Sequence, residues 1–215
     1  MTIPQLIKNY QAKVLQTGLK KSYANISNAY LMTKASLGVS NVRAAFATYN
    51  GVEYPEAKRF IDEFYNNLKI MKTYEKSMYP MTNYTKTKTI TSNIGKDAAT
   101  AVKVLPDGSS VGIHINMNHI RIYVDTNGPY SKPNRLGFDI FEFRVMDSTD
   151  QIKSLKESRR YTDEELENET NVHLAGFPCN KNSTQLLNGM GCAWYAVNDV
   201  SPEDNSKSYW KNLPW

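Results

Sequence analysis

The first stretch whose residue types could do chemistry combines two carboxylates and two side-chain amides in one glycine-containing loop. Its polar groups are Asp125, Asn127, Asn134 and Asp139. Calcium binds several oxygens from such groups, but Asp and Asn side chains also cap the amides of their own turns. The spacing does not match an EF-hand. We therefore expect turn capping here, with a calcium site as the alternative.

The two cysteines, Cys179 and Cys192, are separated by 13 positions. The polar, glycine-containing segment between them can fold back on itself, and closing it would stabilise the fold by roughly 3 kcal/mol in the simple loop model. We predict a disulfide, with two free buried thiols as the alternative. A disulfide implies an oxidising compartment, and neither the number nor the spacing of the cysteines indicates zinc.

The remaining polar residues do not form a catalytic or metal-binding pattern. His114 and His119 are close in sequence, but we expect them on opposite faces, and no third ligand has suitable spacing. The sequence has no Gly-x-Ser-x-Gly nucleophile elbow, and its acidic run at 163–169 is typical of a solvated face. We therefore predict a protein that is not an enzyme and has no cofactor.

Composition restricts the class of protein further. The chain has 215 residues, with 26 Lys and Arg against 21 Asp and Glu and a formal charge of +5. The basic side chains are scattered and form no block, which argues against a nucleic-acid interface. No apolar run approaches the roughly 18 residues of a membrane span. The length fits one globular domain.

The element that must position these residues is a long amphipathic helix, predicted over residues 2–36. Apolar side chains recur there at helical spacing, and lysines fall mostly between them. At about 1.5 Å per residue the helix would be roughly 50 Å long. Its apolar stripe consists of Ile3, Leu6, Ile7, Tyr10, Val14, Leu19, Tyr23, Ile26, Tyr30 and Leu31.

Residues 37–100 are predicted to form a helical insertion and a long surface loop. Pro55 suits a first helical turn, so a second helix is expected over 53–72. Its apolar stripe consists of Ala57, Phe60, Ile61, Phe64, Leu68 and Met71. Residues 73–96 show little periodicity and are predicted to be a surface loop with a short strand near 88–94.

From residue 101 onward, apolar and polar residues alternate, which predicts an antiparallel sheet with one apolar face. The long helix can cover that face. Thr162 and Glu165 have capping-box spacing and predict a short polar helix. Trp210, Pro214 and Trp215 are expected to dock on the sheet or the disulfide loop. The expected strands cover residues 102–104, 111–115, 120–124, 141–145 and 192–197.

Several segments resemble bacterial type IV pilin-like proteins, including the type II secretion pseudopilins. The N-terminal run is similar to the segment that follows the membrane-spanning part of those proteins. In that family a methylated N-terminal residue, a glutamate and an apolar half-helix precede a proline like Pro4, and this chain lacks that part. The similar segments are residues 2–14, 19–29, 124–128, 133–141, 191–194 and 209–215.

The fold we expect is α+β, with a long N-terminal helix packed on an antiparallel sheet. The helix occupies residues 1–36, the helical insertion and loop 37–100, and the sheet with a disulfide-closed C-terminal region 101–215. All three parts are expected to form one globular domain. The resemblance implies the same pilin-like architecture, and some pseudopilins hold calcium in a loop near the C-terminal part of the sheet.

The resemblance implies a structural subunit of a type II secretion pseudopilus or type IV pilus fibre. The expected partners are other pilin-like subunits, together with the inner membrane through the absent N-terminal segment, and no nucleic acid. The globular part would lie in the periplasm or outside the cell, in an extracellular fibre when assembled. Subunit contacts are expected at four residues that are too apolar for a helix tip in water: Ile3, Pro4, Leu6 and Ile7.

The alternative function is an extracellular binding module, similar to an adhesin, that recognises a glycan or a protein. The loops at 73–96 and 125–139 would present its contact groups. The aromatic candidates in these loops are Tyr74, Tyr79, Tyr84 and Tyr130.

Overall fold

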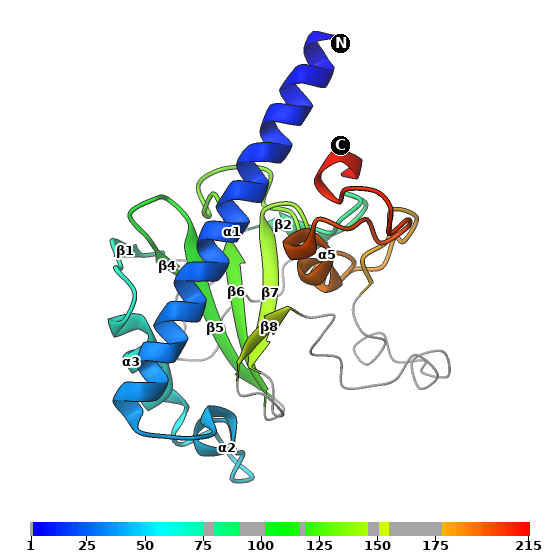
Figure 1. Ribbon diagram of the computed structural model, residues 1–215. Helices are drawn as coiled ribbons and strands as arrows, with labels where there is room; N and C mark the ends of the chain where they lie inside the picture. The colour runs from blue at the N-terminus through cyan, green and yellow to red at the C-terminus, as the bar shows by residue number, and fades with distance from the viewer. Residues whose placement is uncertain (1, 75–79, 91–101, 117–118, 146–150, 155–177) are drawn as a thin grey trace.

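The computed structural model describes residues 2–74, 80–90, 102–116, 119–145, 151–154 and 178–215. A long helix, α1, lies across one face of an antiparallel sheet and extends beyond the sheet at its N-terminal end (Figure 1). This arrangement is the predicted α+β fold. No helix within the described residues is long and apolar enough to cross a membrane.

Helix α1 spans Ile3–Leu37, close to the predicted range. Pro4 lies in its first turn, where a missing N–H costs little. Gly38 ends the helix with a φ of 66°, and its amide donates to the carbonyls of Lys34 and Ala35. A left-handed glycine at this position is a frequent way for a helix to stop.

The buried face of α1 contacts both the sheet and the helical insertion. The ring of Tyr23 stacks on Phe143, while Tyr30 packs edge-on against Phe60. Leu31, which we expected in the apolar stripe, is instead 58% exposed. The reason is that Tyr30 and Thr33 turn inward there, and one residue along a helix is a rotation of about 100°. The buried residues are Ala12, Leu15, Leu19, Ser22, Ile26, Ala29, Tyr30 and Thr33.

The helical insertion differs from its prediction. A short helix that was not predicted, α2, spans Val42–Phe46, and α3 spans Ala57–Asn66, which is shorter than the expected 53–72. Met71 is 56% exposed rather than buried. Its amide donates to the carbonyl of Val104 because the chain has left the helix and joins the sheet as an edge strand.

The main sheet has six antiparallel strands in the order β1-β4-β5-β6-β7-β8. The predicted meander is confirmed, with Ile113 opposite Ile122 and Val124 opposite Phe141. The turn expected at 117–118 lies outside the described residues. The strands are β1 Lys72–Thr73, β4 Lys103–Val104, β5 Ser110–Asn116, β6 His119–Asp125, β7 Ile140–Val145 and β8 Ile152–Ser154.

The two faces of the sheet differ in chemistry, as the alternation predicts. Ile122, Val124 and Phe143 belong to the core beneath α1. On the other face Glu142 is buried, and its Oε1 lies 2.7 Å from Nε of Arg144. A second, smaller core on that side consists of Met81, Ile90, Val102, Tyr123, Leu136, Ile140 and Met190.

The region predicted as a surface loop at 73–96 is partly buried. Strands β2, Met81–Thr82, and β3, Thr89–Ile90, pair with each other, and Asn83 and Tyr84 between them are buried. The Asn83 carboxamide folds this segment, because its Oδ1 accepts the amides of Thr87 and Lys88. The expected strand near 88–94 is thus limited to β3 in the described residues, and its second half lies outside them.

The prediction of a strand at 192–197 is wrong. The segment forms a 3₁₀ turn, η1, at Met190–Cys192, followed by helix α5 at Ala193–Asn198. Buried Ala193 and Ala196 are three residues apart, which is helical spacing, while the bulky residues between them are partly exposed. The bulky residues misled the prediction, because aromatic and β-branched residues favour strands.

Of the C-terminal aromatic residues, Trp210 docks on the sheet as expected, whereas Trp215 contacts the loop before β7 and is 38% exposed. Trp210, in η2 at Trp210–Asn212, is buried, and its ring lies edge-on to Phe141. Its Nε1 donates to the carbonyl of Ala196 at 2.9 Å. Trp215 packs edge-on against Phe138. The polar helix predicted at Thr162 and Glu165 lies outside the described residues.

Candidate functional site

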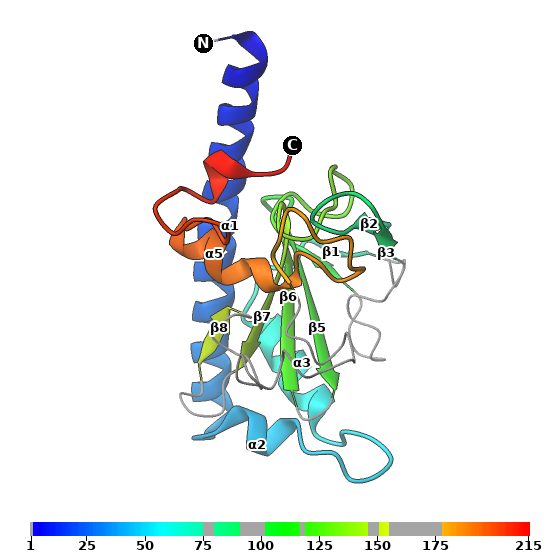
Figure 2. The same ribbon diagram turned by 90° about the vertical axis from the view of Figure 1, so that its right-hand side faces the viewer.

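The first nine residues of α1, which we call the projecting tip (residues 3–11), extend away from the globular body (Figures 1 and 2). All of them are exposed, and burial of the helix begins at Ala12. The tip nevertheless carries large apolar side chains. Their exposed fractions are 76% for Ile3, 59% for Leu6, 51% for Ile7 and 70% for Tyr10. The structure therefore brings the four predicted contact residues, Ile3, Pro4, Leu6 and Ile7, together on one exposed helical segment.

All the charged side chains of α1 are basic. Five lysines lie in the helix, and the first acidic residue of the whole sequence is Glu53. Acidic residues and a side-chain cap stabilise a helix N-terminus in water. The first turn contains no acid, and the side chain of Thr2 makes no capping hydrogen bond. The tip thus lacks the local features that stabilise a helix end in solvent.

The loop at 125–139 is built from capped turns. Asp125 Oδ1 accepts the amides of Asn127 at 3.2 Å and Gly128 at 2.8 Å. Asp139 accepts the amide of Asn134 through Oδ2 at 2.8 Å and that of Arg135 through Oδ1 at 2.6 Å. Turn capping, the arrangement that we favoured, is confirmed.

Asp139 has an unusual environment within this loop. Its side chain is fully buried, and burial raises its pKa to about 6, although amide hydrogen bonds act in the opposite direction. Both carboxylate oxygens are used by backbone amides. Among the described residues, no group of three or more His, Cys, Asp or Glu could hold a metal ion. These carboxylate oxygens are satisfied without a metal ion, and calcium binding at this loop stays a prediction.

The predicted disulfide between Cys179 and Cys192 is present, with the Cα atoms 4.9 Å apart. Cys192 is buried in the main core. Asn188 organises the connecting segment, because its Nδ2 donates to the carbonyls of Asn180 and Ser183, each at 2.8 Å. The bond thereby ties a polar surface loop to the core.

The tyrosines of the binding-module hypothesis separate into two groups. Tyr84 is buried and stacks on Tyr209, with ring centroids 6.2 Å apart, so its expected place on the surface is wrong. Tyr74 and Tyr130 form an edge-on pair, and Lys72 Nζ lies 4.2 Å from the Tyr130 ring centroid. Tyr79 lies outside the described residues.

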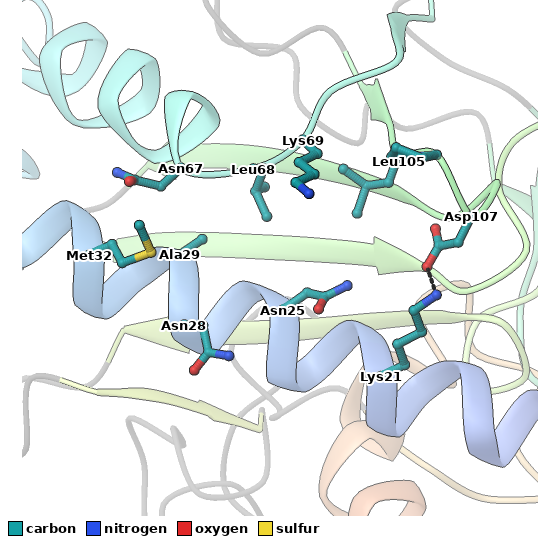
Figure 3. A pocket seen from close by; sticks show the side chains of 11 residues that line it. Lys21, Asn25, Asn28, Ala29, Met32, Asn67, Leu68, Lys69, Leu105 and Asp107 are labelled. Carbon is teal, nitrogen blue, oxygen red and sulfur yellow. Dashed lines mark ion pairs between the residues drawn. The ribbon is translucent and has the colours of Figure 1, made fainter.

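A groove of about 390 Å³ lies between α1, the end of α3 and the turn before β5 (Figure 3). Lys21 Nζ lies 2.8 Å from Asp107 Oδ2 at one end. Partial burial would raise the pKa of Asp107, but hydrogen bonds from Lys21 and Ser109 outweigh it and lower the pKa. Three amide side chains line the groove: Asn25, Asn28 and Asn67. The groove thus offers side-chain amides for hydrogen bonding beside an ion pair.

A second cavity, of about 440 Å³, lies where the projecting tip meets the globular body, and we call it the basal pocket. It is lined by Tyr10, Gln11, Val14, Leu15, Lys86, Asn127, Lys132, Pro133, Arg135, Phe138 and Trp215. These residues come from four separate parts of the chain. Sequence reasoning missed the pocket for that reason, since Lys86 is far in sequence from Lys132 and Arg135.

Arg135 is the most unusual residue of the basal pocket, because it is a cation with only 1% exposure. Its Nη2 donates to the carbonyls of Tyr84 and Pro214, and its Cζ lies 3.7 Å from the Phe138 ring centroid. Its Nη1 is buried and has no hydrogen-bond partner among the residues that the structure describes. Burial lowers the pKa of Arg135 to about 10.

These features define an α+β protein in which a helix is held on an antiparallel sheet and continues past it as an apolar, lysine-bearing tip. The chain belongs to the Family of unknown function (DUF6613), whose profile matches residues 5–184. Comparison with curated proteins and with solved structures gives no match.

Proposed function

We propose that this protein is a pilin-like structural subunit of a type II secretion pseudopilus or type IV pilus fibre, without enzymatic activity. The observation that carries the proposal is the projecting tip, where Ile3, Leu6, Ile7 and Tyr10 are exposed. Fully burying an aliphatic side chain of this size is worth about 1.5–3 kcal/mol. Covering the tip would therefore contribute several kcal/mol to association.

The spacing of the exposed residues suits contact with other helices. Ile3, Ile7, Tyr10 and Val14 follow one another at intervals of four, three and four, and each is at least half exposed. The mean interval is about 3.7 residues, close to one helical turn, so these side chains form one apolar stripe along the helix that can pack against a neighbouring helix. Head-to-tail association of unlike surface patches then generates an open helical filament.

The resemblance adds the anchor and the location. It places an apolar half-helix before Thr2, with a prepilin-type cleavage and methylation signal, which would hold the subunit in the inner membrane. The globular body would lie in the periplasm or at the cell surface. The Cys179–Cys192 disulfide supports an oxidising location of this kind.

A charge-insertion experiment on the full-length gene product tests this proposal. In the double variant Leu6→Asp/Ile7→Asp, carboxylates replace apolar groups at the helix contact. The matched control is Leu31→Asp/Met32→Asp, two residues of the same helix that are 58% and 56% exposed next to the globular body. We expect the first variant to lose filaments from the sheared, sedimentable cell fraction and the control to keep them. Equal filament yields from the two variants would contradict the proposal.

A second candidate is an extracellular binding module, supported by the exposed aromatic cluster of Tyr74, Tyr130 and Lys72. Tyr130 is 62% exposed, and its ring already contacts a cation and a second ring. Aromatic faces of this kind can contact glycans or proteins. A glycan-array signal that Tyr130→Ala abolishes would favour this function, and a signal that survives the substitution would exclude the cluster.

A further inference from the structure

The basal pocket has an unbalanced charge. Lys86, Lys132 and Arg135 line it, and none of its lining residues is acidic. In the part of the chain that the structure describes, neither lysine has an ion-pair partner. Three cations around one cavity create a positive potential that attracts anions.

Arg135 distinguishes the pocket from a surface patch of lysines, because its charge is buried. Its guanidinium is buried and bonded to two carbonyls, and among the described residues no carboxylate lies within ion-pair distance and Nη1 has no hydrogen-bond partner. The buried Asp139 stabilises the charge from a longer distance. A buried charge costs free energy unless an opposite charge or hydrogen bonds compensate it. An oxyanion in the pocket would lower this cost through its negative charge, while Nε and Nη2 stay on their carbonyl partners.

The position of the pocket points to the source of the anion. Tyr10 lines it and also belongs to the projecting tip, only one helical turn, or roughly 5 Å, beyond Ile7. A helix with exposed Ile3, Leu6 and Ile7, several lysines and no acid has the composition of segments that bind anionic membrane surfaces. If the tip enters a bilayer, the pocket lies at the level of the lipid phosphates.

We propose that the basal pocket binds the phosphate group of an anionic phospholipid in the bilayer that receives the tip of α1. Lys86 and Lys132 bind the phosphate, the buried charge of Arg135 adds to the positive potential behind them, and the apolar walls from Val14, Phe138 and Trp215 accept the glycerol and the start of an acyl chain. The proposal goes beyond the filament role and is independent of it, since a chain that forms no fibre can still bind lipid.

Two other occupants fit the pocket less well. The tip of a second copy carries one lysine, Lys8, and no acid, so it offers the three cations no negative charge. Free inorganic phosphate satisfies the cations but leaves the apolar walls of Val14 and Trp215 without a partner. The two phosphate sources are separated in the test below.

The test measures binding of the 215-residue protein to sedimentable vesicles of phosphatidylglycerol in phosphatidylcholine, compared with pure phosphatidylcholine. Lys86→Gln/Lys132→Gln should weaken binding to the anionic vesicles at least tenfold. The control Lys58→Gln/Lys69→Gln removes the same charge from exposed lysines near α3, which lies at the other end of the molecule (Figure 1). It should change binding less than twofold.

A fluorescence titration with water-soluble short-chain phosphatidylglycerol locates the bound lipid. We expect a shift in tryptophan emission that Trp215→Phe abolishes and Trp194→Phe preserves. Equal effects of the two double-lysine variants, no preference for anionic vesicles, or an emission shift that does not depend on Trp215 would overturn the proposal. Complete displacement from the vesicles by millimolar inorganic phosphate at constant ionic strength would assign the pocket to free phosphate and overturn the lipid assignment.

Discussion

The ring of Tyr23 lies flat on the ring of Phe143, with centroids 5.0 Å apart and planes inclined by 16°. Its hydroxyl donates to the carbonyl of Ile152 at 3.1 Å. One side chain of α1 therefore contacts both β7 and β8. This contact holds the middle of the helix on the sheet, while the tip projects.

Replacing this side chain should weaken the packing of the helix on the sheet. We expect Tyr23→Ala to lower the free energy of unfolding by about 3 kcal/mol, because it removes a stacked ring and leaves a cavity. Tyr10→Ala removes the same atoms from an exposed position and should change it by about 0.5 kcal/mol or less. Urea denaturation of both variants measures the difference, and similar losses would contradict the role given to Tyr23.

The fully buried Asp139 carboxyl should make stability depend on pH. Its pKa in the folded protein is raised to about 6, whereas an unfolded Asp titrates near about 3.9. The folded state therefore binds more protons between these values, so stability is highest below about pH 4 for this group and falls as pH rises through about 6. The loss is on the order of 2–3 kcal/mol at about 1.4 kcal/mol per unit.

Thermal unfolding of the wild type and Asp139→Asn across this pH range measures the effect. The variant cannot ionise at this position, so its stability curve should be flatter between pH 4 and pH 6. Identical slopes in the two proteins would show that Asp139 has an ordinary pKa.

The Cys179–Cys192 bond should stabilise the C-terminal region. It closes a loop with a sequence separation of 13, for which the loop-entropy model gives about 3 kcal/mol. We expect Cys179→Ser/Cys192→Ala, or reduction of the wild type, to lower the free energy of unfolding by about that amount. An unchanged midpoint in reducing buffer would contradict this.

Gly128 should be the most sensitive glycine of the polar loop. Its φ is 77°, and an added Cβ would overlap the carbonyl oxygen of Gly108 in the neighbouring turn. Gly51 also has a positive φ, 98°, but open space around it. Gly51→Ala should therefore cost about 1–2 kcal/mol from backbone strain alone, and Gly128→Ala about 3 kcal/mol or more because the two turns must separate. Chemical denaturation of both variants checks this order, and equal losses would contradict it.

Local patterns in the sequence were enough to predict much of the fold. Apolar spacing predicted α1, and the alternation around Ile113, Ile122 and Phe143 predicted three strands of the sheet and the face that α1 covers. The spacing of Cys179 and Cys192 predicted the disulfide. In each case the pattern lies within one segment, or between two residues that are close in sequence. Periodicity or loop length alone is then enough to predict the structure.

The failures have physical reasons as well. Tyr84 is polar and surrounded by threonines and lysines, yet it is buried, because Tyr209 and Arg135 reach it from distant parts of the chain. The segment after Cys192 looks like a strand but packs two alanines at helical spacing. The basal pocket was missed because only folding brings Lys86 next to Lys132 and Arg135.

The filament proposal is tested most directly by cross-linking in cells that express the full-length gene product. Both native cysteines are paired, so Ile7→Cys or Val52→Cys, at positions 51% and 84% exposed, adds a single free thiol to this chain. With a short bis-maleimide, we predict a ladder of oligomers from Ile7→Cys and only monomer from Val52→Cys, which lies in the loop before α3. Monomer alone from Ile7→Cys, or equal ladders from both variants, would contradict a fibre assembled through the projecting tip.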